Sequence, residues 1–432
     1  MKVLIVHQNF PAQYLHLARH WGQQGGHQVV FVTQRRDGQI DGVRKIVYTP
    51  KRGVTKGVHR YLAQTEAAVL NGQAVARVAL ELKRRGFVPD LMLGHNGWGE
   101  IWYLKDIFPD APLVGYFEFF YRLEGADVGF DPQEKVGLDA GPRLRTRNVG
   151  NLLGLQTCDW GQCPTQWQLN GYPTIWHPKL KVMHEGIDTD IVRPDPEATF
   201  RVPNGSLLRA GDEVVTYVAR NLEPYRGFPS FMRSLPLILR DRPQAQIIVV
   251  GGDEVSYGRK LMDGKTYRDT MLQELENRLD LSRVHFVGRL PYATYLRVLQ
   301  VSQAHVYLTL PFVLSWSMLE ALAAGCVVIG SRSAPVEEVI EHGHNGFLAD
   351  MFDPEEIARL VVQVLKDPGA ASSVKAAARR TAVDRFDLKT RCLPQQLEFF
   401  MSVLQGRSAP LRRSPTTSAA ARAPAAHGSA RR

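Results

Sequence analysis

Short apolar runs alternate along this chain with segments whose apolar residues recur every three to four positions. The first pattern predicts buried strands and the second predicts amphipathic helices. Because the two patterns alternate throughout, the sequence predicts parallel sheets joined by right-handed helical crossovers. The predicted strands are Lys2–Gln8, Gln28–Gln34, Lys45–Thr49, Leu91–Gly94, Leu113–Phe119 and Leu180–His184, then Val214–Ala219, Gln246–Val250, Val284–Val287, His305–Leu310 and Val327–Gly330.

The alternation is interrupted once, near the middle of the chain. Residues 186–206, GIDTDIVRPDPEATFRVPNGS, are polar and rich in Pro and Asp, which is typical of a linker. We therefore expect two doubly wound α/β domains of ordinary size, residues 1–185 and 213–405, joined by a linker at 186–212. Residues 406–432 are rich in Ala, Ser, Pro and Arg, and we expect a disordered tail that folding does not need.

The charge of the chain is concentrated in this tail. The formal net charge is +10, but residues 406–432 hold six Arg and no acidic residue, so the remainder has 47 basic and 43 acidic side chains. A net charge of +4 is a weak argument for nucleic acid binding by the folded part. If the chain binds nucleic acid through the tail, removing residues 406–432 should abolish the binding.

The sequence does not indicate secretion or a membrane span. No apolar run is long enough to cross a bilayer, and the first residues, MKVLIVHQNFPAQ, predict a strand, not a signal peptide. The four cysteines include no CxxC pair, which indicates neither a zinc site nor a disulfide framework. We expect a cytoplasmic protein, because these features fit a reducing compartment.

Two basic groups in the first half suggest peripheral contact with the inner face of a membrane or with a lipid-diphosphate acceptor. The alternative is scattered, solvated surface charge. The groups are Lys51, Arg52, Lys56, His59 and Arg60, and then Arg143, Arg145 and Arg147, the last three on a predicted basic amphipathic helix at Arg143–Gln156.

The stretch Leu310–Gly330, LPFVLSWSMLEALAAGCVVIG, predicts a strand end, a tight loop, a short helix at Ser317–Ala324 and a second strand. A helix N-terminus behind a strand can bind an anion, because free backbone N–H groups and the helix dipole point to one place. Glu320, one turn into the helix, would then reach a sugar hydroxyl beside the anion. Alternatively, Ser317 and Glu320 form only a capping box.

Six motifs in the second half, in this order, resemble the nucleotide-binding domain of retaining family 4 glycosyltransferases of the GT-B fold. The first half is similar to the amino-terminal domain of one bacterial branch, and the two resemblances cover residues 1–405. The motifs are HQNFPAQ at 7–13, YFEFFYR at 116–122, HEGIDTDIVRP at 184–194, YVARNLEPYRG at 217–227, IIVVGGD at 247–253, VHFVGRL at 284–290, SWSMLEALAAG at 315–325 and HNGFLAD at 344–350.

This resemblance implies two facing Rossmann-like domains and transfer of a sugar from a nucleotide-diphosphate sugar, with retention of configuration. The acceptor would be a glycan or a lipid-linked glycan in bacterial polysaccharide assembly. It implies no cofactor beyond the donor, because cations and oriented N–H groups would neutralise the leaving diphosphate. One alternative is a nucleotide-sugar epimerase of the same fold, and another is a nucleotide-sugar-binding protein without activity.

On the donor side, the resemblance assigns Arg220 and Arg226 to the diphosphate, although the second position is usually Lys in the family. Arg keeps the charge but replaces a point charge with a planar fork. The alternative for both is a solvated surface pair. The base would lie near Val287–Arg289, which contains Gly288 and Arg289. The ribose would contact Glu320, and the phosphates would contact the backbone of Ser315, Trp316, Ser317 and Met318.

Phe312 departs from the family pattern. The family has two Glu residues eight positions apart, and the first of them falls on Phe312, where a side chain usually contacts the transferred sugar. This replacement is the reason for considering a protein that binds the donor without turnover.

On the acceptor side, the resemblance points to Glu118, at a position where the family often has His. Glu118 either orients the acceptor hydroxyl or takes its proton, or it is a structural carboxylate paired with Arg122 or Arg143. Asn9, Gln13 and His95 are further acceptor-side candidates, although a lone His is more often structural.

Asp188 and Asp190 form an Asp-x-Asp motif, which binds metal in a different glycosyltransferase fold. Here the motif lies in the predicted linker, where Asp is common in turns and caps. Because one short Asp-x-Asp without other oxygen ligands is a weak metal signal, we predict no metal site.

Overall fold

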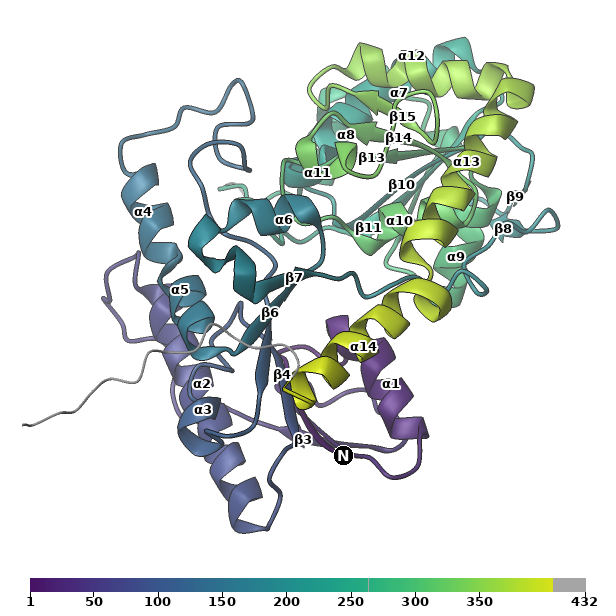
Figure 1. The fold of residues 1–432 in the computed structure, drawn as a ribbon. Coiled ribbons are helices and arrows are strands. Elements are labelled where there is room, and N and C mark those ends of the chain that lie inside the picture. The colour runs from purple at the N-terminus through teal and green to yellow at the C-terminus, as the bar shows by residue number, and fades with distance from the viewer. Residues whose placement is uncertain (263, 407–432) are drawn as a thin grey trace, which may run out of the picture.

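The computed structural model describes residues 1–262 and 264–406, which form two α/β domains (Figure 1). The predicted tail at 407–432 lies outside the described residues. The first domain is built on a seven-stranded parallel sheet in the order β3-β2-β1-β4-β5-β6-β7. Its strands are β1 Lys2–Val6, β2 Gln28–Thr33, β3 Val43–Val47, β4 Leu91–His95, β5 Leu113–Tyr116, β6 Trp160–Cys163 and β7 Leu180–Val182.

Strand β1 shows why both faces of this sheet are covered. Val3 and Ile5 pack in one cluster of buried residues, while Leu4 and Val6, which point the other way, pack in a second cluster. A strand that is apolar on both sides needs helices on both sides. The helices of this domain are α1 Leu15–Gln23, α2 Ala63–Arg84, α3 Leu104–Ile107, α4 Ala140–Arg147, α5 Val149–Thr157 and α6 Gln166–Gly171.

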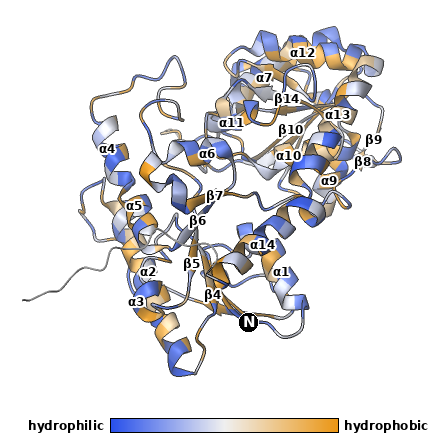
Figure 2. Ribbon diagram, viewed as in Figure 1, coloured by the Kyte–Doolittle hydropathy of each residue, from blue (hydrophilic) through white to orange (hydrophobic). Residues whose placement is uncertain are grey.

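The second domain has a six-stranded parallel sheet in the order β12-β11-β10-β13-β14-β15. Figure 2 shows hydrophobic strands inside both domains. The helices around them carry both hydrophilic and hydrophobic residues. The strands are β10 Val214–Asn221, β11 Gln246–Gly252, β12 Val284–Gly288, β13 Ala304–Tyr307, β14 Val327–Ser331 and β15 Phe347–Ala349. The helices are α7 Phe228–Asp241, α8 Tyr267–Glu274, α9 Tyr292–Val301, α10 Trp316–Ala323, α11 Ala334–Glu337, α12 Pro354–Lys366 and α13 Pro368–Phe386.

The segment 186–212, expected as a linker, contains an antiparallel hairpin of β8 Thr199–Arg201 and β9 Leu207–Arg209. Its apolar residues Phe200 and Leu208 are buried against the second sheet, in a cluster with Val214 and Ile248. The chain therefore crosses between the domains over only the first part of this segment. Each strand has only three residues, one of them Arg, and the surrounding sequence is polar, so the pattern did not reveal the hairpin.

The chain crosses a second time after α13. Ile187 exchanges backbone hydrogen bonds with this return path, from Ile187 N to Phe386 O at 2.8 Å and from Leu388 N to Ile187 O at 2.9 Å. The last helix, α14 Leu393–Leu404, then packs on the first domain beside α1, where Phe400 contacts Trp21 (Figure 1). None of the helices in residues 1–262 and 264–406 is both long and apolar enough to cross a bilayer.

The predicted single helix at Arg143–Gln156 is two helices, α4 and α5, which meet at Asn148. The Asn148 side chain accepts from Tyr121 N at 2.9 Å and donates to Tyr121 O at 2.7 Å. These two bonds tie the helix junction to the segment that follows β5. The continuous helical pattern in the sequence gave no sign of this break.

Candidate functional site

A cavity of about 970 Å³ lies between the two domains. Gln13, after β1, and Glu118, after β5, line it from the first domain. Arg220 in β10 and the first turn of α10 line it from the second domain. Ligands of doubly wound folds bind at the carboxyl ends of the strands, and this cavity has such ends on both sides.

Arg226 is a buried cation without a counter-ion. It ends a turn of 3-10 helix at Pro224–Arg226 and is only 8% exposed. Its guanidinium donates to Thr309 Oγ1 at 2.7 Å, to Tyr307 Oη at 3.3 Å and to Val313 O at 3.2 Å. All three acceptors are neutral, and no carboxylate of the described residues pairs with it. Since Arg226 lines the cavity, its charge is available to an anionic ligand.

Arg220 lies on the same wall but is exposed. Among the described residues its side chain has no hydrogen bond or ion pair, although its charge helps to lower the pKa of Glu118 across the cavity. The second-domain wall therefore carries two positive charges that the protein itself does not neutralise.

The N-terminus of α10 differs from the prediction. The helix is capped by Ser315, whose Oγ accepts from Ser317 N at 3.3 Å. The alternative prediction, a capping box of Ser317 and Glu320, is therefore wrong. The Met318 amide donates to Ser315 O at 3.2 Å, and the Met318 side chain is fully buried in the core. Two amides that we expected to be free for phosphate thus have partners within the turn.

Glu320 instead faces the cavity between two tyrosines. One of its carboxylate oxygens accepts from Tyr292 Oη and the other from Tyr295 Oη, both at 2.8 Å. Burial raises the pKa of this carboxyl, and the two phenols oppose that shift. Sequence reasoning missed both tyrosines. Their only signal was their position in the first turn of a helix directly after the VHFVGRL motif.

On the opposite wall, a chain of hydrogen bonds fixes Glu118. Asn9 N donates to His7 Nδ1 at 2.8 Å, which leaves the proton of neutral His7 on Nε2. That proton is donated to Gln13 Oε1 at 2.8 Å, and Gln13 Nε2 donates to Glu118 Oε1 at 2.7 Å. Asn9 therefore contributes its backbone, and its side chain does not line the cavity.

His95 supports Glu118 from behind. Gly97 N donates to His95 Nδ1 at 2.9 Å, and His95 Nε2 lies 3.3 Å from Glu118 Oε2. His95 is 2% exposed and does not line the cavity, contrary to the expectation. The alternative pairing of Glu118 with Arg122 is not formed either, because Arg122 donates to Gly125 O. Arg143 likewise has no ion pair with Glu118 in the described residues.

The state of Glu118 follows from these contacts. Burial by itself would raise the pKa of the carboxyl. His95, Gln13 and the charge of Arg220 outweigh burial and lower the pKa below its ordinary value. Glu118 is therefore an ionised acceptor with two oxygens fixed in place.

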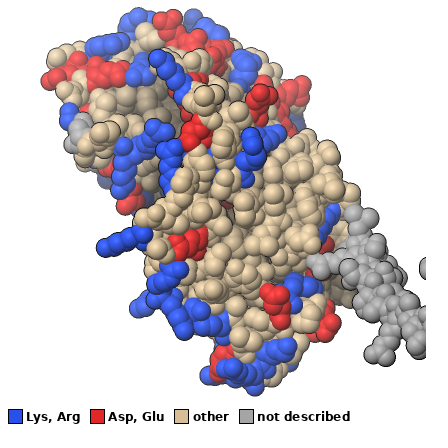
Figure 3. Space-filling model, turned by 90° about the vertical axis from the view of Figure 1, so that its left-hand side faces the viewer, with Lys and Arg blue, Asp and Glu red and all other residues tan. Residues whose placement is uncertain are grey.

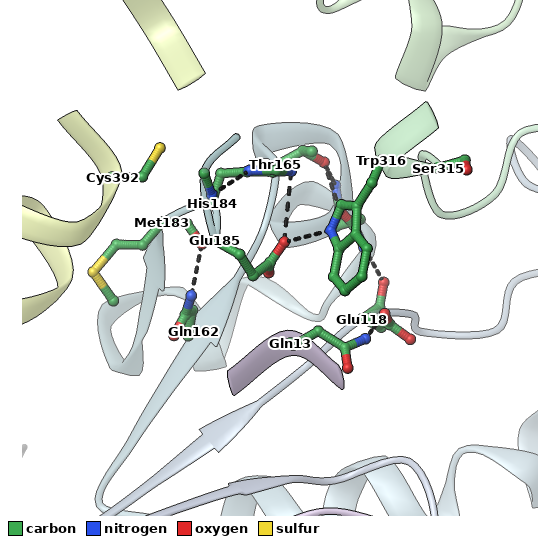
Figure 4. A network of polar contacts seen from close by, with 12 residues as sticks. Gln13, Glu118, Gln162, Thr165, Met183, His184, Glu185, Ser315, Trp316 and Cys392 are labelled. Carbon is green, nitrogen blue, oxygen red and sulfur yellow. Dashed lines mark hydrogen bonds and ion pairs between the residues drawn. The ribbon is translucent and has the colours of Figure 1, made fainter. Parts of the chain in front are cut away.

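Glu185 joins the two domains at the edge of the cavity. It is 4% exposed and accepts from Tyr116 Oη and from Trp316 Nε1, the latter at 3.0 Å. Figure 4 shows Trp316 reaching from the start of α10 toward Glu185. Sequence reasoning did not select Glu185, although the HEG motif at the domain junction contains it.

Phe312 does not line the cavity but forms an aromatic cluster behind it. Its ring centroid lies 4.6 Å from that of Phe119 and 5.2 Å from those of Tyr225 and Tyr257. Phe119 belongs to the first domain, so the cluster spans the domain boundary. Tyr225 extends the contact by donating to Asp127 Oδ2 at 2.5 Å.

Gly288 and Arg289 lie at the carboxyl end of β12, outside the cavity lining. Arg289 pairs with Glu254 at 2.6 Å and donates to Asn221 Oδ1 at 2.8 Å. Gly288 has a φ of +65°, and an added Cβ there would meet open space. The backbone at this position is thus accessible to a ligand.

Asp188 and Asp190 form a turn, not a cation site. Asp188 Oδ1 accepts from Asp190 N at 3.2 Å, and Lys389 lies 3.4 Å from Asp188 and 2.7 Å from Asp190. Across residues 1–262 and 264–406, no group of three or more His, Cys, Asp or Glu is placed to hold a metal ion.

Two family models match successive parts of the chain. Residues 25–192 match the model described as Glycosyl transferase family 4 group, and residues 202–381 match Glycosyl transferases group 1. Among solved structures, sucrose-phosphate synthase from Thermosynechococcus elongatus has a TM-score of 0.69 at 18% identity, covering 94% of this chain and all of that one. HepE of Anabaena in complex with UDP-glucose has a TM-score of 0.65 at 18% identity, with 93% and 100% covered. These similarities confirm the GT-B fold.

Two curated relatives are similar to this chain in sequence. A GDP-mannose-dependent alpha-(1-6)-phosphatidylinositol monomannoside mannosyltransferase of Mycolicibacterium smegmatis is 25% identical over 368 residues, 80% of this chain and 87% of the relative. A D-inositol 3-phosphate glycosyltransferase of Streptomyces avermitilis is 28% identical over 215 residues, 47% of this chain and 43% of the relative.

Proposed function

We propose that this chain transfers a sugar from a nucleotide-diphosphate sugar to a glycan or lipid-linked acceptor, with retention of configuration and without a metal, in bacterial polysaccharide biosynthesis. The observation that carries the proposal is Arg226, a buried cation without a counter-ion, which faces the interdomain cavity beside Arg220. The family models and the two curated relatives named for sugar transfer support the same reaction class.

In this proposal the donor lies along the second-domain wall. Arg220 and Arg226 bind its diphosphate, and Arg226 can form two parallel N–H···O bonds to one phosphate. Glu320, held by Tyr292 and Tyr295, accepts from a ribose hydroxyl with its remaining lone pairs. In this proposal the base lies against the open backbone at Gly288, beside Arg289, and the phosphates lie near the Ser315–Ser317 turn.

The acceptor lies against Glu118. During transfer the bond between the anomeric carbon and the diphosphate oxygen breaks, and a bond from the anomeric carbon to the acceptor oxygen forms. Because its lowered pKa makes Glu118 a weak base, Glu118 orients the hydroxyl by accepting its hydrogen bond. The hydroxyl proton passes to the leaving diphosphate. The two arginines neutralise the charge on that group, which is the work that a metal would otherwise do.

We further propose a cytoplasmic location with peripheral contact at the inner face of the membrane. A lipid-linked acceptor presents its sugar at the membrane surface, and the enzyme would have to approach it there. The four cysteines, all of them free thiols and buried, fit a reducing compartment.

The second candidate is a nucleotide-sugar-binding protein without turnover, and Phe312 favours it, since an aromatic cluster occupies the place of a carboxylate. Donor binding with no product over a broad acceptor panel would support it. Rearrangement of the donor without acceptor would identify an epimerase instead.

Thermal shift with UDP-, GDP- and ADP-sugars tests the donor site, because a ligand of the folded state raises the melting temperature. Arg226→Gln should remove the shift, while Arg240→Gln, an exposed arginine on α7, should keep it. If no nucleotide-sugar raises the melting temperature of the wild type or of Arg240→Gln, the proposal is contradicted. NMR of the product made with the donor so identified gives the anomeric configuration.

A further inference from the structure

Helix α5 presents apolar side chains to solvent. Val149, Leu152 and Leu153 are 44%, 42% and 37% exposed, and their spacing places them on one side of the helix. The other side, with Gly154 and Leu155, is buried in the first domain. Soluble proteins seldom expose an apolar stripe of this kind without a partner for it.

Segments next to α5 in the sequence also expose apolar side chains. Leu138, just before α4, is fully exposed, and Val136 and Leu123 are also exposed. Leu123 lies 4.0 Å from the position that a Cβ of Gly141 in α4 would occupy, which places the loop beside the helix. We name this area, formed by α4, α5 and residues 123–138, the α4–α5 face.

Basic residues adjoin the α4–α5 face. Arg143 and Arg145 are exposed on α4, and Arg147 stacks on Tyr121 at 3.8 Å. The loop that carries Lys51, Arg52, Lys56 and Arg60 is joined to α4 through the ion pair of Arg60 with Asp139, at 2.5 Å. Figure 3 looks onto this side of the molecule and shows a broad area with few charged side chains, surrounded by Lys and Arg and by some Asp and Glu.

The acidic residues of the area do not cancel this charge fully. Asp139 is paired with Arg60, Glu66 with Arg52 at 2.7 Å, and Asp127 is bonded to Tyr225. Glu124, Asp131 and Glu134 are further acidic residues of this area, so residues 51–66 and 123–147 together hold eight Lys or Arg and six Asp or Glu. Residues 51–62 contain no acidic residue. An apolar stripe flanked by Lys and Arg is complementary to a bilayer with anionic headgroups.

The α4–α5 face is coupled to the site. Asn148, between α4 and α5, holds both backbone groups of Tyr121, and Asn151 Nδ2 donates to Phe119 O at 2.9 Å. Glu118, Phe119 and Tyr121 therefore lie on one short segment that runs from the cavity to the helices of this face.

We infer that the α4–α5 face docks the protein on an anionic lipid bilayer, with α5 inserting its apolar stripe and the flanking Arg and Lys contacting the headgroups. Docking places the Glu118 segment next to the membrane surface. This inference rests on the proposed function only in taking the acceptor to be lipid-linked.

The test is sedimentation of the full chain with phosphatidylcholine vesicles, with and without phosphatidylglycerol. The wild type should bind the anionic vesicles and lose binding as salt rises. Two double variants test the face, one with Leu152→Ser and Leu153→Ser and the other with Arg143→Ser and Arg145→Ser. Each should reduce the partition coefficient about tenfold. Ile175→Ser, at an exposed apolar residue elsewhere in the first domain, and Arg240→Ser with Arg359→Ser should bind as the wild type does.

Equal sedimentation with neutral and anionic vesicles, or wild-type binding by both face variants, would overturn the inference, and so would a stable dimer that only the face variants disrupt. Residues 407–432 are present in every protein compared, so their arginines cannot produce a difference. Vesicle binding needs no donor, and thermal shift with the donor on the same variants reports separately on folding and on the proposed function.

Discussion

Trp316 Nε1 donates a hydrogen bond of 3.0 Å to Glu185 Oε2, and this bond joins the first turn of α10 in the second domain to the crossing between the domains. Glu185 is almost completely buried, so its carboxylate depends on the donors that reach it. Tyr116 supplies one from the first domain. The cavity thus has, at its edge, a carboxylate that both domains hold.

Trp316→Phe should destabilise the protein by about 1–3 kcal/mol, because it leaves a buried carboxylate oxygen without its donor. Phe lacks the second ring of Trp, so the loss combines the hydrogen bond with some packing of a side chain that is 41% exposed. Urea unfolding measures it, and Glu185→Gln, which keeps an acceptor and removes the charge, serves as the comparison. If Trp316→Phe unfolds at the wild-type urea concentration, Glu185 is satisfied in another way.

Arg226→Gln should lower kcat/KM by about 10²–10³, or roughly 3–4 kcal/mol, because one electrostatic contact to the leaving group is lost. Arg226→Lys keeps the charge but loses the fork that reaches Thr309 and Val313 together, and it should retain more activity than the Gln variant. Arg220→Ala should lower the rate in the same range. Initial rates with the identified donor measure all three, with Arg240→Gln as control.

Near-normal rates in both Arg220→Ala and Arg226→Gln would contradict the assignment of the diphosphate site. Folding has to be checked for Arg226→Gln in particular, since the side chain is buried. An unchanged urea midpoint combined with a lost rate would place the effect on the reaction.

The architecture could be predicted because α/β domains repeat a strong local signal. Buried parallel strands are apolar on both faces, so runs such as Val3–Val6 are visible without knowledge of their partners. The motifs then indicated which strand ends carry polar side chains. Short strands such as β6 and β15 were missed, because four or three residues leave little pattern to read.

The contacts that build the site could not be read in the same way. Glu185 and Trp316 are 131 residues apart, and neither has a local pattern that points to the other. The cap of α10 shows a related limit. Both Ser315 and Ser317 are good cap residues, and tertiary contacts decide between them, because Glu320 is drawn to Tyr292 and Tyr295.

Phe312→Ala should lower the melting temperature and raise the KM for the donor, since the aromatic cluster that spans the domains loses its central ring. Phe312→Leu should restore much of the stability, because it refills the volume. Phe312→Glu should be the least stable, since it places a charge among aromatic rings. A gain of activity in Phe312→Glu would support the second candidate function, in which the wild type binds the donor without turnover.

Acid should destabilise the protein through buried histidines. Burial lowers the pKa of His305 to about 3 and that of His16 to about 4. Since both lie below the ordinary value, the unfolded chain takes up these protons first. Their contribution is complete above about pH 6.5 and is lost as the pH falls toward the folded-state values.

The expected slope is about 1.4 kcal/mol per pH unit for each such histidine in that range. Urea unfolding between neutral pH and about pH 5 measures it, and His305→Asn should make the slope smaller by about one proton. A variant with the wild-type slope would show that His305 takes up its proton in the folded state.

Chelation should leave the activity essentially unchanged. The Asp-x-Asp pair, Asp188 and Asp190, is used for a turn and for ion pairs with Lys389, and two arginines face the place where the leaving group would lie. Asp188→Asn and Asp190→Asn should each keep the rate and cost at most about 1 kcal/mol in stability, because the ion pairs are partly exposed. Lys389→Met, which removes the shared partner, should match them. The assay is the initial rate with and without EDTA for the wild type and these variants. Loss of wild-type activity in EDTA that Mn²⁺ or Mg²⁺ restores would show that a cation, and not the arginine pair alone, neutralises the leaving diphosphate.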